Sequence, residues 1–148
     1  MGLFDIIKQL APDLSSDNNE RSHGNSRYNK SIDEWDNEWR CIGKLVSADL
    51  SSLNHSVGLY RHTIGGETMY VGRALELHNG GLRKRLSDYR RQSNSARTHT
   101  SGRTVNEHLN DIVTYVLVVG DDEEAVEVTR KLEMRFIARY NPPWNKIR

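Results

Sequence analysis

Two predicted helices carry a charged side chain beside their apolar face, where an apolar residue would cost less. In the last helix of the chain, Glu133 follows Leu132 at the edge of an apolar stripe. A carboxylate that close to a core is costly unless it is paired or holds a metal ion; the simpler alternative is contact with water or with Arg130. In an earlier helix, Arg85 shares a face with Tyr89, where it either extends to solvent or meets an anion. These two groups could hold a metal ion and a phosphate.

Two tyrosines and a further arginine lie on a predicted β-hairpin that precedes the Arg85 helix. The pattern predicts strands over 57–64 and 68–71, joined by a tight turn at two glycines. Tyr60 lies on the first strand, Tyr70 on the second, and Arg73 just after it. Taken singly, a tyrosine in a strand is usually a packing residue with one hydrogen-bonded hydroxyl group.

Basic side chains are concentrated in one stretch. Residues 82–103 carry seven Lys or Arg and one acidic residue, a net charge of +6, whereas the whole chain has a net charge of +1. Such a stretch can bind phosphates through counterion release, although a solvated helix face is the simpler interpretation of charge alone. The candidate nucleic-acid contacts are Arg83, Lys84, Arg90, Arg91, Arg97 and Arg103.

The remaining patterns predict the elements that position these groups. Helices are expected over 32–40, over 82–91 and from Asp121, as N-cap with Glu124 as its capping-box partner, to about Tyr140. A continuous apolar run predicts a strand over 112–119, and residues 93–102 are expected to form a polar basic loop. The fold class is therefore α/β (α+β), with a small three-stranded mixed or antiparallel sheet flanked by helices and an N-terminal helical extension.

Composition divides the chain into two parts. Residues 1–31 are expected to form an N-terminal helix or tail, with a helical pattern over 3–10, followed by a flexible polar linker. Residues 32–148 are expected to form one domain with its core over 57–148. A single cysteine excludes a disulfide framework and any cysteine-based zinc cluster, and no apolar run approaches the ~20 residues that span a bilayer. A cytoplasmic location is the simplest expectation.

Taken together, the motifs resemble those of the GIY-YIG nuclease superfamily. Gly58-Leu59-Tyr60 is followed after nine residues by Tyr70-Val71-Gly72, then by Arg85 and Glu133 on helices and by Asn145. The segment 82–89 looks like the arginine helix of the excision-repair incision module, the ending 139–145 resembles small phage endonucleases, and the lead-in 39–45 resembles restriction enzymes of the superfamily. The resemblance covers residues 57–148 and implies a GIY-YIG fold.

The resemblance also implies a role for each motif residue. Glu133 would bind a divalent metal, Mg²⁺ with Mn²⁺ as the alternative, and Arg85 would hold the scissile phosphate. Tyr60 is preferred as general base, with Tyr70 as its rival. Supporting roles fall to Arg73 as a cation, to Tyr89 in orienting water or a phosphate oxygen, and to Asn145 in fixing the end of the Glu133 helix. No motif assigns a role to His62, His78, His99 or His108.

The resemblance predicts a metal-dependent endonuclease that hydrolyses DNA phosphodiester bonds, of the restriction, phage or mobile-element type. Two alternatives stay open: a nucleic-acid-binding module whose GIY-YIG fold no longer cleaves, and an RNA nuclease, because the basic stretch contacts the backbone in either case. DNA is the expected partner, with RNA not excluded and no membrane partner. A double-strand cutter needs two active sites, so a homo-oligomer is compatible with a chain of this length.

Overall fold

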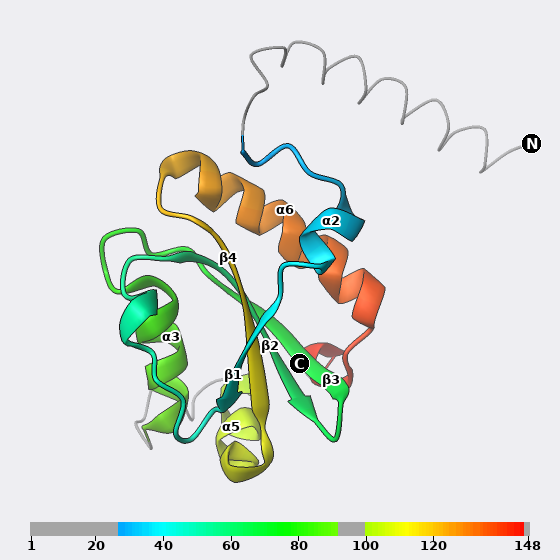
Figure 1. Cartoon of the computed structure of the whole chain (residues 1–148). Helices are drawn as coiled ribbons and strands as arrows, with labels where there is room; N and C mark the ends of the chain where they lie inside the picture. The colour runs from blue at the N-terminus through cyan, green and yellow to red at the C-terminus, as the bar shows by residue number, and fades with distance from the viewer. Residues whose placement is uncertain (1–26, 92–99, 147–148) are drawn as a thin grey trace, which may run out of the picture. The chain divides into compact units, whose positions relative to one another are not determined.

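A computed structural model describes residues 27–91 and 100–146 (Figure 1). The predicted helix over 3–10, most of the predicted linker, Arg97 and His99 lie outside these residues. Residues 27–31 belong to one unit and the domain from Ile32 onward is another. Its elements are α2 (Ile32–Asp36), β1 (Arg40–Lys44), η2 (Ser51–Leu53), β2 (Val57–Ile64), β3 (Glu67–Ala74), α3 (Gly81–Arg90), α5 (Thr100–Glu107), η3 (Leu109–Asp111), β4 (Val113–Gly120), α6 (Glu123–Tyr140) and η4 (Pro143–Lys146).

The strands form one antiparallel sheet in the order β1-β4-β2-β3 (Figure 1). The predicted α+β class is confirmed, but the prediction of three strands is wrong, because β1 adds a fourth at the edge beside β4. Strand β1 has the sequence RCIGK and no fully buried side chain, so it lacks the alternating apolar pattern from which strands are predicted. Its backbone pairing with β4, from Arg40 opposite Val116 to Lys44 opposite Val113, creates the strand.

Helices α3 and α6 cover opposite faces of the sheet. Successive side chains of a strand point to opposite faces. On β2, the Tyr60 hydroxyl reaches Tyr89 of α3, whereas the guanidinium of its neighbour Arg61 lies 4.8 Å from the ring of Tyr140 on α6. The face under α3 carries a buried apolar cluster that includes Leu82, Leu86, Val105 and Val116.

A glycine lets β2 and β4 approach closely at the start of the hairpin. A Cβ atom on Gly58 would lie 2.1 Å from the carbonyl oxygen of Leu117, which is too close for any side chain. Gly58 pairs with Ala74 of β3 on its other side, so β2 lies in the interior of the sheet at this point. The close packing of β2 against β4 therefore requires a glycine at position 58, the first residue of the Gly58-Leu59-Tyr60 motif.

The ends of α6 follow the usual capping chemistry, with one difference from the prediction. Asp122, not Asp121, is the N-cap residue: its side chain accepts a hydrogen bond from the backbone N–H of Ala125. Glu124 is then the second helical residue, where it cannot form the predicted capping box. At the other end Asn141 adopts φ of 50° and ends the helix before Pro142.

The predicted loop over 93–102 is wrong at its end, because helix α5 begins at Thr100. The polar sequence TSGRTVNE has few apolar residues to signal a helix. Val105 nevertheless enters the core as a fully buried side chain, and Asn106 donates a hydrogen bond to the backbone carbonyl of Tyr89. Tertiary contacts thus stabilise α5. None of the helices in the described part of the chain is long and apolar enough to cross a bilayer.

Candidate active site

A buried pair of tyrosines joins β2 to α3. The hydroxyl oxygens of Tyr60 and Tyr89 lie 2.7 Å apart, and both side chains are buried. Burial raises the pKa of the Tyr60 phenol well above its usual value, and the phenols of Tyr89 and Tyr70 add to the shift. Burial likewise raises the pKa of Tyr89. Both groups are therefore neutral at physiological pH, with one hydroxyl donating to the other.

The ring of Tyr60 lies directly over the backbone of β3. A Cβ atom on Gly72 would lie 2.4 Å from Cζ of Tyr60, so only glycine leaves room for this ring. Tyr70, two residues earlier on the same face of β3, is half-buried, and its ring centroid lies 6.3 Å from that of Tyr60. The glycine and tyrosine of the second motif are thus explained by packing against the tyrosine of the first.

Arg85 lies beside these tyrosines and is paired with a carboxylate that belongs to no motif. Its guanidinium donates a 2.6 Å hydrogen bond to Glu76, in the segment between β3 and α3. It is also close enough to Tyr60 and Tyr89 to act on their ionisation. Arg83, two residues earlier, is exposed on another face of the helix.

Glu133 reaches the same edge of the sheet from α6 on the opposite face. Its carboxylate accepts a 3.1 Å hydrogen bond from Arg73 of β3. Burial raises the pKa of Glu133, while the positive charges of Arg73 and, more weakly, Arg85 oppose that shift. Arg130 is not its partner, since that side chain pairs with Glu127. Groups from both faces of the sheet thus meet around β3.

Asn145 anchors η4 to the outer edge of β3. Its side-chain amide donates to the carbonyl of Val71 and accepts from the N–H of Val71, both at 2.9 Å. Asn145 was expected to form hydrogen bonds that fix the end of the Glu133 helix. The bonding partner is wrong, because the amide binds the backbone N–H and carbonyl of Val71, which an edge strand leaves unpaired. Its role is to fix the backbone between Tyr70 and Gly72.

The basic residues predicted to contact nucleic acid do not lie together with these groups. Arg83, Lys84, Arg90 and Arg91 line a separate groove, and Arg103 is an exposed residue of α5. Arg90 has a structural role, because its guanidinium donates to the backbone carbonyls of Leu45 and Ala48. The candidate site comprises Tyr60, Tyr70, Arg73, Glu76, Arg85, Tyr89 and Glu133, with His62 packed against its tyrosines.

Sequence reasoning missed two residues here. No sequence pattern points to Glu76, because it lies between a strand and a helix in a segment without hydrophobic periodicity. His62 follows Tyr60 by two residues and so shares its face of β2, which was the available signal. Its ring is fully buried within about 5 Å of the rings of Tyr60 and Tyr89, and its Nδ1 lies 2.8 Å from the hydroxyl of Thr114.

The residues present fit a divalent ion held by one carboxylate. Arg73 contacts Oε1 of Glu133, and no described residue forms a hydrogen bond with Oε2. No group of three His, Cys, Asp or Glu side chains that could enclose a metal occurs among the described residues. Mg²⁺ suits such a site, because it keeps several waters and is bound through one or two carboxylates together with substrate phosphates.

No family model and no curated protein matches this chain. Matching solved structures include the GIY-YIG N-terminal endonuclease domain of UvrC from Thermotoga maritima bound to its catalytic divalent cation, magnesium, at 20% identity over 63% of this chain and 86% of that chain, with a TM-score of 0.46. Two point mutants of that domain, each bound to the catalytic divalent cation, match at 22% identity over 65% of this chain and 88% of theirs, with TM-scores of 0.44 and 0.43. These solved structures come from the superfamily whose motifs the sequence resembles. Because these TM-scores are below 0.5, the structural similarity does not assign a function, and the side chains described above have to do so.

The burial of His62 predicts a specific acid sensitivity. Burial lowers the pKa of His62 to about 3, so the unfolded chain binds this proton more readily and stability falls as the pH drops below the unfolded value of about 6.5. Between pH 6.5 and 5 the free energy of unfolding of the wild type should therefore fall on the order of 1–2 kcal/mol more than that of His62→Phe. Urea denaturation of both proteins at a series of pH values measures this, and parallel curves would contradict a neutral buried imidazole.

The Arg85–Glu76 pair predicts that Glu76 competes with phosphate for the guanidinium. Glu76→Gln should therefore bind a short oligonucleotide more tightly, on the order of a few-fold for a partly exposed ion pair. Fluorescence anisotropy measures the affinity, and Glu67→Gln at the exposed start of β3 is the control with the same charge change. Equal affinities for the two variants would show that Glu76 does not compete.

Proposed function

We propose that the protein is a metal-dependent endonuclease that hydrolyses DNA phosphodiester bonds with an active site of the GIY-YIG type. The observation that carries the proposal is the meeting of Arg85, Glu133 and the three tyrosines at one edge of the sheet. Arg85 and Glu133 come from helices on opposite faces, and the charge of Arg85 acts on the ionisation of both Tyr60 and Glu133. In-line hydrolysis of a phosphodiester needs a cation that stabilises the developing charge, a group that holds the metal and hydrogen-bonding groups around the phosphate. The guanidinium, the carboxylate and the phenols can supply these.

In this proposal the substrate phosphate takes the place of Glu76 at Arg85. A guanidinium binds two phosphate oxygens through parallel hydrogen bonds and stabilises the charge that develops as water attacks. Glu133 holds the metal, and Arg73 orients that carboxylate through the 3.1 Å contact with Oε1. A bound divalent ion would supply charge stabilisation and an activated water.

The general base is the role for which burial matters most. The motif alone favours Tyr60 as the general base, but its side chain is 1% exposed and its hydroxyl group is hydrogen-bonded to that of Tyr89. Because a base must meet the attacking water, half-buried Tyr70 suits this role better. Tyr60 then remains protonated and positions the Tyr89 hydroxyl through their hydrogen bond, and Tyr89 orients a phosphate oxygen or the water.

The first test is the incubation of supercoiled plasmid with purified protein, with Mg²⁺ or with EDTA. The proposal predicts nicking or linearisation with Mg²⁺ and intact plasmid with EDTA. A discrete band pattern on linear DNA would then indicate sequence specificity. Intact plasmid with several divalent ions would contradict DNA cleavage and would favour an RNA substrate or a binding module.

Two variants separate chemistry from binding. Glu133→Ala should slow cleavage at least about 1000-fold while DNA binding is kept, because the loss of a metal costs several kcal/mol of transition-state stabilisation. Arg85→Ala should reduce both cleavage and binding, since charge-assisted hydrogen bonds to phosphate are lost. Rates on plasmid and anisotropy on a labelled duplex measure the two effects. Glu127→Ala, an exposed change on α6, is the control, and an active Glu133→Ala protein would contradict the metal assignment.

A further inference from the structure

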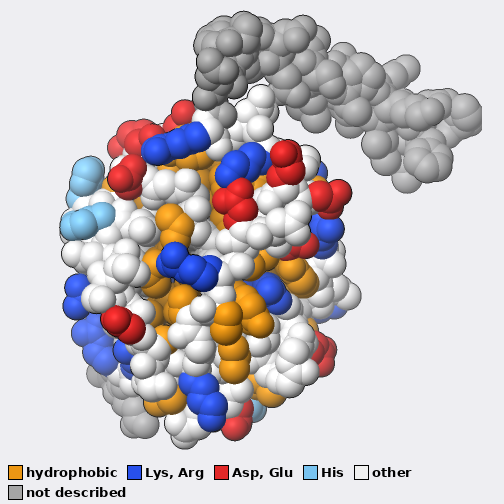
Figure 2. Space-filling view, in the orientation of Figure 1, with side chains coloured by type: hydrophobic (Ala, Val, Ile, Leu, Met, Phe, Trp, Pro, Cys, Tyr) orange, Lys and Arg blue, Asp and Glu red, His pale blue; other side chains and the backbone are white. Residues whose placement is uncertain are grey.

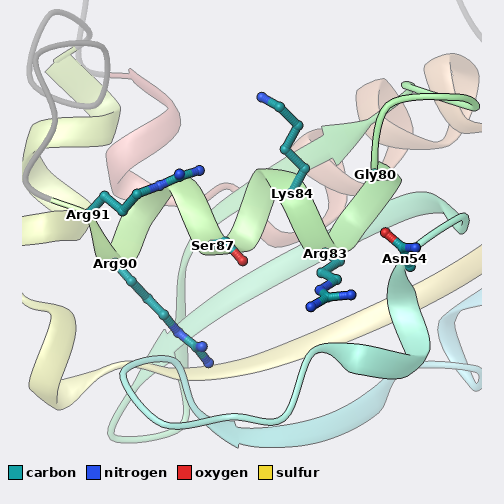
Figure 3. A pocket seen from close by; sticks show the side chains of 7 residues that line it. All are labelled: Asn54, Gly80, Arg83, Lys84, Ser87, Arg90 and Arg91. Carbon is teal, nitrogen blue, oxygen red and sulfur yellow. The ribbon is translucent and has the colours of Figure 1, made fainter.

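A second, strongly basic groove lies on the outer side of helix α3. It has a volume of about 430 Å³ and runs between α3 and the segment around η2 (Figure 3). Its lining consists of Asn54, Gly80, Arg83, Lys84, Ser87, Arg90 and Arg91. On the face shown in Figure 2, Lys and Arg side chains gather at the margin where α3 lies in Figure 1.

This groove and the candidate active site use different sides of the same helix. Ser87, at the centre of the groove, follows Arg85 by two residues, which is about 200° around an α-helix. Arg85 and Tyr89 face the sheet and the tyrosine cluster, whereas Arg83, Lys84 and Arg91 are exposed. The basic stretch of the sequence is thus divided between two sites.

One side of the groove is held rigidly. Arg90 donates to the carbonyls of Leu45 and Ala48, which ties α3 to the segment before η2. Nearby, Asp49 accepts hydrogen bonds from the backbone N–H and hydroxyl of Ser51. These bonds lower the pKa of Asp49, with a smaller contribution from the charge of Arg83. The wall opposite α3 is therefore positioned by hydrogen bonds.

The charge of the groove is only partly neutralised. Lys84 and Arg91 share a single carboxylate, Asp88, at the solvent-exposed surface. Arg83 forms neither a hydrogen bond nor an ion pair with any other residue that the structure describes. Exposed pairs of this kind are weak, so an anion can displace Asp88 at little cost.

We infer that this groove binds the phosphodiester backbone of the nucleic acid that the active site cuts, at phosphates away from the scissile one. The inference rests on the proposed function and adds a second contact region to it. From Arg83 to Arg91 the helix advances about 12 Å, which covers about three to four nucleotide steps at the rise of 3.4 Å per step along a duplex. The lining offers charged and polar donors and no aromatic side chain on which a base could stack, which favours contacts with the backbone.

The test is the salt dependence of duplex DNA binding, measured by fluorescence anisotropy in the Glu133→Gln background, where cleavage does not interfere. The variant Arg83→Ala/Lys84→Ala removes two exposed charges from the groove. The matched control Lys131→Ala/Arg135→Ala removes two exposed charges from α6, and thermal unfolding of both checks the fold. The groove variant should bind at least about tenfold more weakly, with a slope of log K against log salt that is shallower by about 1.8.

A second variant, Ser87→Asp, adds a carboxylate at the centre of the groove and should also weaken binding, whereas inorganic phosphate should compete only at high concentration. Equal binding by the groove and control variants, or tight competition by inorganic phosphate alone, would overturn the inference. The outcome is independent of cleavage: weakened binding by the groove variants together with an intact plasmid would reject the nuclease proposal and keep the groove.

Discussion

The hydroxyl groups of Tyr60 and Tyr89 form a buried hydrogen bond that joins helix α3 to strand β2, and the candidate active site is built outward from this contact. The bond is 2.7 Å long and lies in the buried cluster under α3. It requires the ring of Tyr60 to cross β3 where Gly72 has no side chain. Because the ring fits only there, the two glycine–tyrosine motifs are one packing unit.

The charges of the site are balanced in pairs before any substrate binds. Arg73 pairs with Glu133 and Arg85 with Glu76, so both cations of the candidate site already have a carboxylate partner. The two pairs come from opposite faces of the sheet and meet at β3, whose outer edge Asn145 fixes by two hydrogen bonds. The sheet edge thus positions groups that neither helix could bring together alone.

Sequence patterns were sufficient for the parts of the fold that bury a regular face. The hairpin of β2 and β3, the apolar strand β4 and the amphipathic helices α3 and α6 all follow from periodicity and turn residues. The positions of Arg85 and Glu133 followed from their place beside an apolar stripe. Strand β1 and helix α5 could not be predicted, because backbone pairing and one buried valine stabilise them. Glu76 could not be predicted either, because only the folded chain brings it into contact with Arg85.

The coupling between Tyr60 and Tyr89 is the most direct measure of this account. Single-turnover cleavage of DNA by Tyr60→Phe, Tyr89→Phe and the double variant forms a double-mutant cycle. If one hydrogen bond organises the site, each single variant loses a similar factor and the double variant loses little more than either alone. Losses that multiply in the double variant would show that the two hydroxyl groups act independently and would contradict the account.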